Sequence, residues 1–317
     1  ENTARSNARV SEELDLGNRQ DFENARKGFI AAPPSLQVAG PDEALVWDMP
    51  SYDFIEGEAP STVNPSLWRQ ATLNNIHGLF KVTEGVYQLR GFDLSNMSII
   101  EGKTGWIVVG PLTTKETAAA AIAFARQQLG NKPISAIIFT HSHIDHFGGV
   151  QSALGAGPNT EIIAPVGFMD EATSENVIAG TTMSRRSMFM YGSQLEHSDR
   201  GHVGSGLGKG PAFGSVGIAP PTRIIDTTGE AVTIDGVEFV FQNAPGSEAP
   251  AELTFYLPEL KAFCGAEVVS RTMHNLYTLR GTKVRDARKW SHYIDEAINL
   301  FPNAEVYFGS HHWPLWG

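Results

Sequence analysis

Four side chains that commonly bind metal ions lie within six residues of one another: His141, His143, Asp145 and His146. They follow an apolar, β-branched run, residues 134–139, which is typical of a buried strand. In an extended segment the first two histidines, two residues apart, point the same way. The aspartate and the third histidine come after the chain has begun to turn and can face a second position. The spacing therefore predicts two neighbouring metal sites at the carboxyl end of a strand, a usual place for sites in α/β sheets.

A polar surface loop is the simpler alternative, and a single His-x-His pair would leave it open. Three histidines and one aspartate in six residues, directly after a buried strand, make it the weaker interpretation. Imidazole and carboxylate ligands together suit zinc, and they are also compatible with iron or manganese.

The surrounding segments predict strands and helices that would position this motif. Strands are expected at residues 80–82, 86–89, 96–109 (a hairpin), 161–165, 223–225, 231–241 (a pair with a turn at Asp235-Gly236) and 305–308. Helices are expected at 113–129, which is Ala-rich and ends at Gly130, and at 287–300, which has one apolar face. Hairpins followed by strand–helix–strand indicate an α/β fold, an αββα sandwich of two mixed sheets covered by helices.

Two regions lie outside this pattern. Residues 1–40 are polar, with a helical stretch over Ser11–Lys27, and we expect an arm that packs on a catalytic domain formed by residues 41–317. Residues 169–220 are rich in Ser, Gly, Met and Arg and are interpreted as a long insertion with a flexible loop at 201–217. Long loops in compact domains are often functional. This one could form a lid or an apolar wall for an alkyl chain, with ordinary loop packing as an equal alternative.

The overall composition excludes some classes of function. The net charge of −11 over 317 residues argues against a nucleic-acid partner, but not against a small anion bound by local arginines and metal ions. No apolar run is long enough to predict a transmembrane helix. Cys264 is the only cysteine, which excludes an intrachain disulfide. The sequence starts at Glu1 without a signal peptide, so we expect a processed or trimmed chain.

The pattern His141-x-His143-x-Asp145-His146 resembles the signature of the metallo-β-lactamase fold. This resemblance implies the same αββα sandwich. Many members of that fold have an aspartate after the strand where this chain has Gly110, and that aspartate commonly supports a metal ligand. Support for the ligands must therefore come from other residues in this chain.

Downstream residues resemble a narrower group, the zinc-dependent alkylsulfatases of the metallo-β-lactamase superfamily. Glu248 and Glu267 stand where many relatives have histidine and aspartate. Together with the segments 273–281 (Met-His-Asn-Leu-Tyr-Thr-Leu-Arg-Gly) and 310–314 (Ser-His-His-Trp-Pro), they carry a resemblance that covers roughly residues 40–317.

The resemblance to alkylsulfatases implies two Zn²⁺ ions per chain. It implies that one ion is bound by His141, His143 and Glu248, and that the other is bound by Asp145, His146 and His312, with Glu267 bridging the two. His311 competes with His312 for the last position, and His312 is preferred.

The same resemblance implies which residues act on the substrate. Those assigned to catalysis are Asp145, Tyr191 and Glu267. Those assigned to the sulfate are Asn275, Tyr277, Arg280 and Arg285. A guanidinium offers a planar set of donors that matches an oxyanion, but the two arginines reach one sulfate only if Gly281 bends the chain. Either arginine alone could instead form a surface ion pair with Asp286 or Asp295.

The implied function is hydrolysis of alkyl sulfate esters to alcohol and inorganic sulfate, with hydroxide held by the two metals as nucleophile. Attack at sulfur would break the S–O bond, attack at carbon would break the C–O bond with inversion, and both fit the sequence. The alternatives are another hydrolase of this fold, acting on a phosphoester or lactone, and a non-catalytic binder of anionic amphiphiles. The resemblance implies that alkylsulfatases continue into a dimerisation domain and a sterol-carrier-like domain. Neither follows the catalytic domain in this sequence, so we expect both to be absent from this chain. We also expect a homodimer for the longer protein, and a periplasmic or secreted location.

Overall fold

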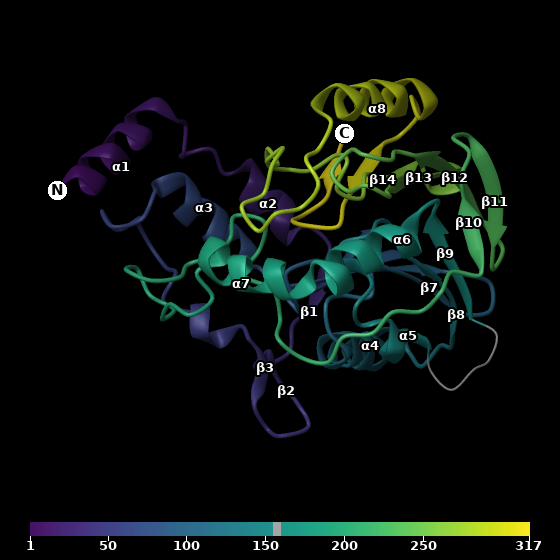
Figure 1. Ribbon diagram of the computed structural model, residues 1–317, viewed down its shortest axis with the longest axis horizontal. Helices are drawn as coiled ribbons and strands as arrows, with labels where there is room; N and C mark the ends of the chain where they lie inside the picture. Colours follow the sequence, from purple (N-terminus) through teal and green to yellow (C-terminus); the bar gives the residue numbers. More distant parts are fainter. Residues whose placement is uncertain (155–159) are drawn as a thin grey trace.

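The computed structural model describes residues 1–154 and 160–317, and it contains two facing β-sheets (Figure 1). Within these residues the first sheet has eight strands, in the spatial order β1 (Phe29–Ala31), β4 (Gly78–Thr83), β5 (Val86–Arg90), β6 (Met97–Glu101), β7 (Trp106–Val109), β8 (Ile134–Ile138), β9 (Glu161–Pro165) and β10 (Arg223–Ile225). The second sheet, over the same described part, has six: β11 (Glu230–Ile234), β12 (Val237–Asn243), β13 (Leu253–Leu257), β14 (Ala262–Cys264), β15 (Val306–Phe308) and β16 (Leu315–Trp316).

Helices cover the outer face of each sheet, so the predicted αββα sandwich is confirmed. Helices α4 (Lys115–Leu129) and α5 (Val150–Leu154) pack their alanines and valine on the first sheet. Helix α8 (Ala287–Leu300) covers the second sheet from the opposite side (Figure 1). The expected apolar face of α8 is only partly buried, because Trp290 and Ala297 face the sheet whereas Ile298 is 65% exposed.

Strand β8 shows why the metal motif follows a continuous apolar run. It pairs in parallel with β7 on one side and β9 on the other. Ile137 belongs to the apolar cluster under the helices, and Ile138 to the cluster between the sheets. Because both faces of the strand are buried from Ala136 onward, its last three residues are all apolar, and the polar Ser135 lies in the less buried first part.

The N-terminal residues are helical, but the first helix begins earlier than the range 11–27 in which helical structure was expected. They form α1 (Asn2–Glu13) and α2 (Gln20–Arg26), and α1 buries no side chain. Helix α1 lies beside α3 (Pro65–Asn74) and stands off the main body at the left of Figure 1. Helix α2 is anchored instead, since its Phe22 packs in a cluster with Trp313. A small sheet of β2 (Gln37–Ala39) and β3 (Leu45–Asp48) follows.

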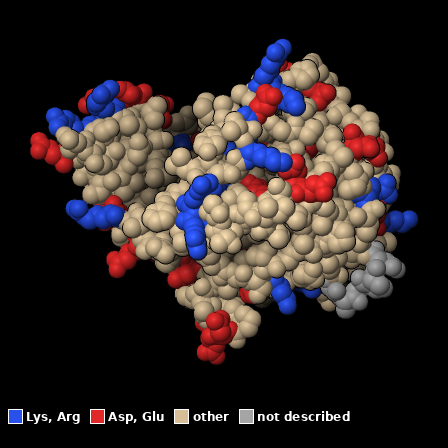
Figure 2. All heavy atoms as spheres, in the orientation of Figure 1, with Lys and Arg blue, Asp and Glu red and all other residues tan. Residues whose placement is uncertain are grey.

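The first half of the expected insertion is helical, so the loop prediction was wrong there. It contains α6 (Phe168–Thr173), the π-helical turn η3 (Ser174–Ile178) and α7 (Gly180–Tyr191). Buried Phe168 and Met183 anchor these helices on the body. Short 3₁₀ turns complete the elements: η1 (Pro50–Tyr52), η2 (Ile144–His146) and η4 (Pro258–Leu260). Of the helices described, none is long and apolar enough to cross a membrane. The face in Figure 2 carries acidic and basic side chains interspersed.

Candidate metal centre

The metal motif lies where the ends of the two sheets meet. Beyond β8, His141 pairs with Glu252 in an isolated β-bridge, just before β13 begins. The amide of Leu253 donates to the carbonyl of Thr140 at 2.9 Å, which closes the connection. This pairing brings the segment containing Glu248 against the motif, although the two are far apart in the sequence.

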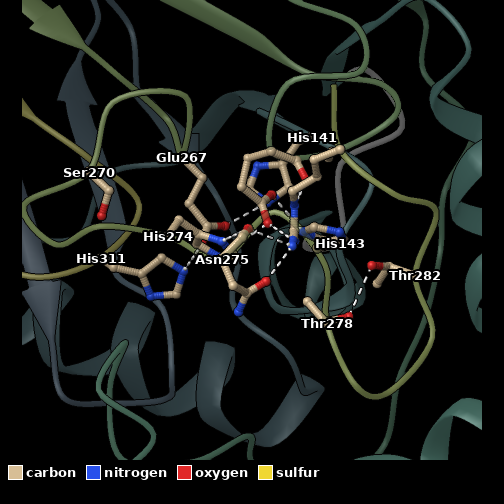
Figure 3. Close-up of polar contacts among 12 residues, drawn as sticks. His141, His143, Glu267, Ser270, His274, Asn275, Thr278, Thr282 and His311 are labelled. Carbon is tan, nitrogen blue, oxygen red and sulfur yellow. Dashed lines mark hydrogen bonds and ion pairs between the residues drawn. The ribbon is translucent and has the colours of Figure 1, made fainter. Parts of the chain in front are cut away.

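The structure gathers seven buried side chains into two groups, and in each group one potential ligand atom per residue lies within 4.8 Å of the others. The first group is His141, His143, Glu248 and Glu267, and the second is Asp145, His146 and His311. Figure 3 shows Glu267 between His141 and His311. Its Oε2 lies 3.0 Å from His141 Nε2 and 3.3 Å from His146 Nε2, and its Oε1 lies 3.3 Å from His311 Nε2. Glu267 thus occupies the place of a bridging carboxylate.

The structure places His311 rather than His312 in this centre, so the preference for His312 is corrected. Both histidines lie in the bend that follows β15, and His312 has a positive φ of 60°, which turns its side chain away from that of His311. Its ring is turned toward α3, where Nδ1 lies 3.0 Å from Gln70 Nε2 and 3.1 Å from Asn74 Oδ1. Its Nε2 lies 3.2 Å from Thr272 Oγ1, so both ring nitrogens are occupied.

The side chains of the two groups fit bound metal ions. Within the part of the chain that is described, several of their buried polar atoms have no hydrogen-bond partner: His141 Nε2, His146 Nε2, His311 Nε2 and Glu248 Oε2. Such atoms normally have partners, and one cation in each group would supply them. Burial lowers the pKa of His141 to about 4, so its imidazole is neutral, the form that binds metals. Burial alone would raise the pKa of Glu267, but the neighbouring histidines hold that pKa well below its usual range.

Support for the ligands comes from residues that the sequence did not single out. At Gly110 (φ 65°) an added Cβ would lie 3.8 Å from His146 Nδ1, and that nitrogen has no hydrogen-bond partner in residues 1–154 and 160–317. The hydroxyl of Thr140 lies 3.0 Å from His141 Nδ1. Fully buried Glu252 accepts four hydrogen bonds, including those from the amides of Glu248 and Glu267. Its only signal in the sequence is a carboxylate directly before an apolar strand.

A cavity of about 620 Å³ opens over the centre and contains most of the predicted substrate-binding residues. Asn275, Arg280, Arg285 and Tyr191 line it, together with Asp145, Glu248 and Glu267. Tyr277 does not line it and is 56% exposed, so the structure leaves this residue outside the site. A second, more apolar cavity of about 550 Å³ shares His143, Asp145, Tyr191 and Arg280 with the first.

The two arginines reach the centre because the chain bends at Gly281, which has a φ of 102°. Buried Arg285 forms an ion pair with Glu248 and donates from Nη1 to Asn275 Oδ1 at 2.8 Å. Arg280 Nη1 lies 3.0 Å from Glu175 Oε1. Neither arginine therefore forms the alternative surface pair with Asp286 or Asp295.

His274, which precedes Asn275, also faces the centre (Figure 3). Its Nε2 lies 3.3 Å from Glu248 Oε1 and 3.4 Å from Glu267 Oε1. Sequence reasoning missed it, although the segment 273–281 that contains it was singled out.

The family profile described as the metallo-beta-lactamase superfamily matches residues 90–311. An alkyl/aryl-sulfatase of Saccharomyces cerevisiae is 48% identical to this chain, and a linear primary-alkylsulfatase of Pseudomonas sp. is 47% identical, each over 99% of the chain. The chain spans only about half of these relatives, 50% and 48% of their lengths.

Two solved structures have folds similar to that of this chain. The stereoselective inverting sec-alkylsulfatase Pisa1 from Pseudomonas sp. is 42% identical, with a TM-score of 0.95 over 99% of this chain and 51% of that one. A metallo-beta-lactamase from Hirschia baltica is 18% identical, with a TM-score of 0.52 over 76% of this chain and 92% of that one, and shares the fold alone. The chain therefore belongs to the metallo-beta-lactamase superfamily.

Proposed function

We propose that this chain hydrolyses alkyl sulfate esters to the alcohol and inorganic sulfate, and that it uses two Zn²⁺ ions. The observation that carries the proposal is the 42–48% identity, over 99% of the chain, to three proteins named as alkyl or alkyl/aryl sulfatases. The two groups of buried ligands, with arginines at one wall of the same cavity, add a physical reason.

The metal ions would be held by His141, His143, Glu248, Glu267, Asp145, His146 and His311. When bound, such a pair supplies Lewis acidity and lowers the pKa of water toward about 7. Asp145 and Glu267 belong to the two ligand groups and also line the cavity, so their carboxylates can orient a water molecule and accept its proton.

Other side chains of the cavity suit a sulfate monoanion. Arg280 offers the charge and the donors that match its oxygens. Because Arg285 donates to Asn275 Oδ1, the Asn275 amide directs its own N–H donors elsewhere and can offer them to the substrate. Burial raises the pKa of the Tyr191 phenol, so this group stays protonated near neutral pH and can donate to an ester oxygen.

The second cavity suits the alkyl chain. Met183, Phe213 and Val216 line it, whereas Phe189, in the same helix as Met183, is 89% exposed. Both cavities are lined by Asp145 and Arg280, which supports a substrate bound with its polar head near the metal ligands and its tail in the more apolar cavity.

The decisive experiment measures sulfate release from dodecyl sulfate and from a chiral secondary alkyl sulfate in oxygen-18 water, with the zinc content of the same sample. We expect sulfate release with about two zinc ions per chain, the number that a two-metal site requires. Label in sulfate would mean S–O cleavage, and label in an inverted alcohol would mean C–O cleavage. The control is His143→Ala, which should abolish turnover.

Absence of sulfate release by the fully metallated protein would refute the proposal. Turnover of a phosphoester or lactone would then favour another hydrolase of the fold. Retention of dodecyl sulfate affinity by His143→Ala, with no turnover by either protein, would favour a binder of anionic amphiphiles. Homodimerisation and a periplasmic or secreted location stay predictions, which light scattering and cell fractionation would test.

A further inference from the structure

The π-helical turn η3 inverts the usual distribution of apolar and charged side chains. Val177 and Ile178 are 71% and 81% exposed, whereas the side chain of Glu175 is 11% exposed and lines the second cavity. Carboxylates are rarely buried unless they are paired, and π-helical turns are frequently found at functional sites. A local conflict of this kind indicates that the position of Glu175 serves the site.

Glu175 lies between two groups of the proposed site. Its Oε1 accepts a hydrogen bond from Arg280 Nη1 at 3.0 Å. Its Oε2 lies 3.6 Å from His143 Nε2, which is too long for a hydrogen bond, and this buried nitrogen has no other partner among the described residues. His143 Nδ1 is 2.9 Å from Glu248 Oε2 and so faces the metal centre, which leaves Nε2 on the outer side of the ring. Histidines that bind metals commonly donate their outer N–H group to a carboxylate, which orients the ring and fixes the tautomer.

We propose that Glu175 is a positioning residue that connects His143 with Arg280 and thereby holds the sulfate-binding guanidinium at a set place beside the metal centre. This inference rests on the proposed function, since it takes an alkyl sulfate as the ligand of Arg280. A guanidinium has five N–H donors, so Arg280 can bond Glu175 through Nη1 and still direct other donors into the cavity. Without this anchor, the carboxylates of Glu248 and Asp145, which also act on Arg280, would draw its long side chain toward the metal ligands.

The alternative is a purely structural role, in which the Glu175–Arg280 ion pair only stabilises the packing of η3 on the segment that contains Arg280. A second ion pair offers the matched control, because Glu171 Oε2 lies 2.5 Å from Lys283 Nζ and joins the same two segments. Neither Glu171 nor Lys283 lines the two cavities. If stabilising this packing were the only role, substitution of either glutamate should cause a similar loss of activity and affinity.

The test compares Glu175→Gln with Glu171→Gln in three measurements: KM and kcat for dodecyl sulfate, zinc affinity by competition with a chromophoric chelator, and affinity for inorganic sulfate. For Glu175→Gln we expect kcat/KM and zinc affinity each to fall about 10- to 100-fold, the usual effect of losing such a supporting group. Most of the fall in kcat/KM should arise from KM, and sulfate affinity should fall with it. We expect Glu171→Gln to match the wild type in all three.

Equal losses in the two variants would overturn the proposal, and so would unchanged zinc and sulfate affinities in Glu175→Gln. A lower KM in Glu175→Gln would also overturn it, because a role as a simple negative charge predicts that removing the charge favours an anionic ester. Zinc and sulfate affinities do not depend on turnover. They therefore test the role of Glu175 between His143 and Arg280 even if the wild-type chain releases no sulfate from an ester. Absence of sulfate release would refute the proposed function but not this role.

Discussion

Glu252 should stabilise both the fold and the metal centre, although it is not itself among the predicted ligands. Its Oε2 accepts hydrogen bonds from Ser247 Oγ at 2.8 Å, from the Glu248 amide at 3.1 Å and from the Ala249 amide at 3.0 Å. Its Oε1 accepts from the Glu267 amide at 3.1 Å. One carboxylate therefore holds the backbone of two candidate ligands, Glu248 and Glu267.

The expected losses follow from these bonds. Glu252→Ala leaves three buried amides without an acceptor, and each costs about 1–3 kcal/mol, so the free energy of unfolding should fall by at least about 3 kcal/mol. Glu252→Gln can keep its oxygen at the Oε2 position and retain three bonds, but its amide N–H₂ then faces the N–H of Glu267. This change should cost about 1–3 kcal/mol.

The assay is urea and thermal unfolding of the metal-free protein, with zinc affinity measured by chelator competition. An average unfolding entropy of about 2 cal/mol/K per residue makes 1 kcal/mol equivalent to about 1.5 °C in a chain of 317 residues. We therefore expect Glu252→Ala to lower Tm by at least about 5 °C, and both variants to weaken zinc binding at least about 10-fold. The control is Glu259→Ala, which replaces an exposed glutamate just after β13, the strand that Glu252 directly precedes.

The reasoning would be refuted if Glu252→Ala unfolded within about 0.5 kcal/mol of the control, the range of ordinary surface substitutions. It would also be refuted if Glu252→Gln were less stable than Glu252→Ala, because the order follows directly from the number of amides left without an acceptor.

Three further predictions concern other parts of the chain. His311→Ala should reduce bound zinc toward one ion per chain while His312→Ala keeps both, and metal analysis giving the reverse would restore His312 as the ligand. Burial alone would raise the pKa of Asp21, but its bond to Arg271 holds that pKa below the ordinary value. Asp21→Asn should therefore reduce stability at pH 7 by about 1–2 kcal/mol. This difference should shrink progressively as the pH falls below about 3.9, the ordinary value of an unfolded aspartate. Urea unfolding at pH 7 and at a series of pH values below about 4 checks it, and an equal loss throughout the series would contradict it. Burial lowers the pKa of Lys209 to about 7, whereas a lysine in the unfolded chain has a pKa of about 10.4. Between these two pH values the unfolded state binds more protons than the folded state, so wild-type stability should rise with pH. Lys209→Met should flatten this rise in urea unfolding, and an unchanged slope would show that another group causes it.

The sequence determined the type of ligand and its place in the fold. Histidines and an aspartate directly after an apolar, β-branched run are a local pattern, and it correctly predicted the buried strand β8 and the turn that follows it. Helix α8 was predicted with its observed bounds, because the apolar period and its N-cap Asp286 are also local signals. The bend at Gly281 follows from a single residue type.

Only the tertiary structure decided which side chains meet. His311 and His312 are identical in type, and the turn after β15 selects the one that faces Glu267. Tyr277 belongs to a segment that reaches the site, yet its side chain points to solvent. Glu175 and Glu252 carry no motif, because their roles depend on partners brought close by the packing of two sheets and the helices around them. Local sequence patterns report backbone conformation and burial, whereas contacts between distant segments depend on how these elements pack.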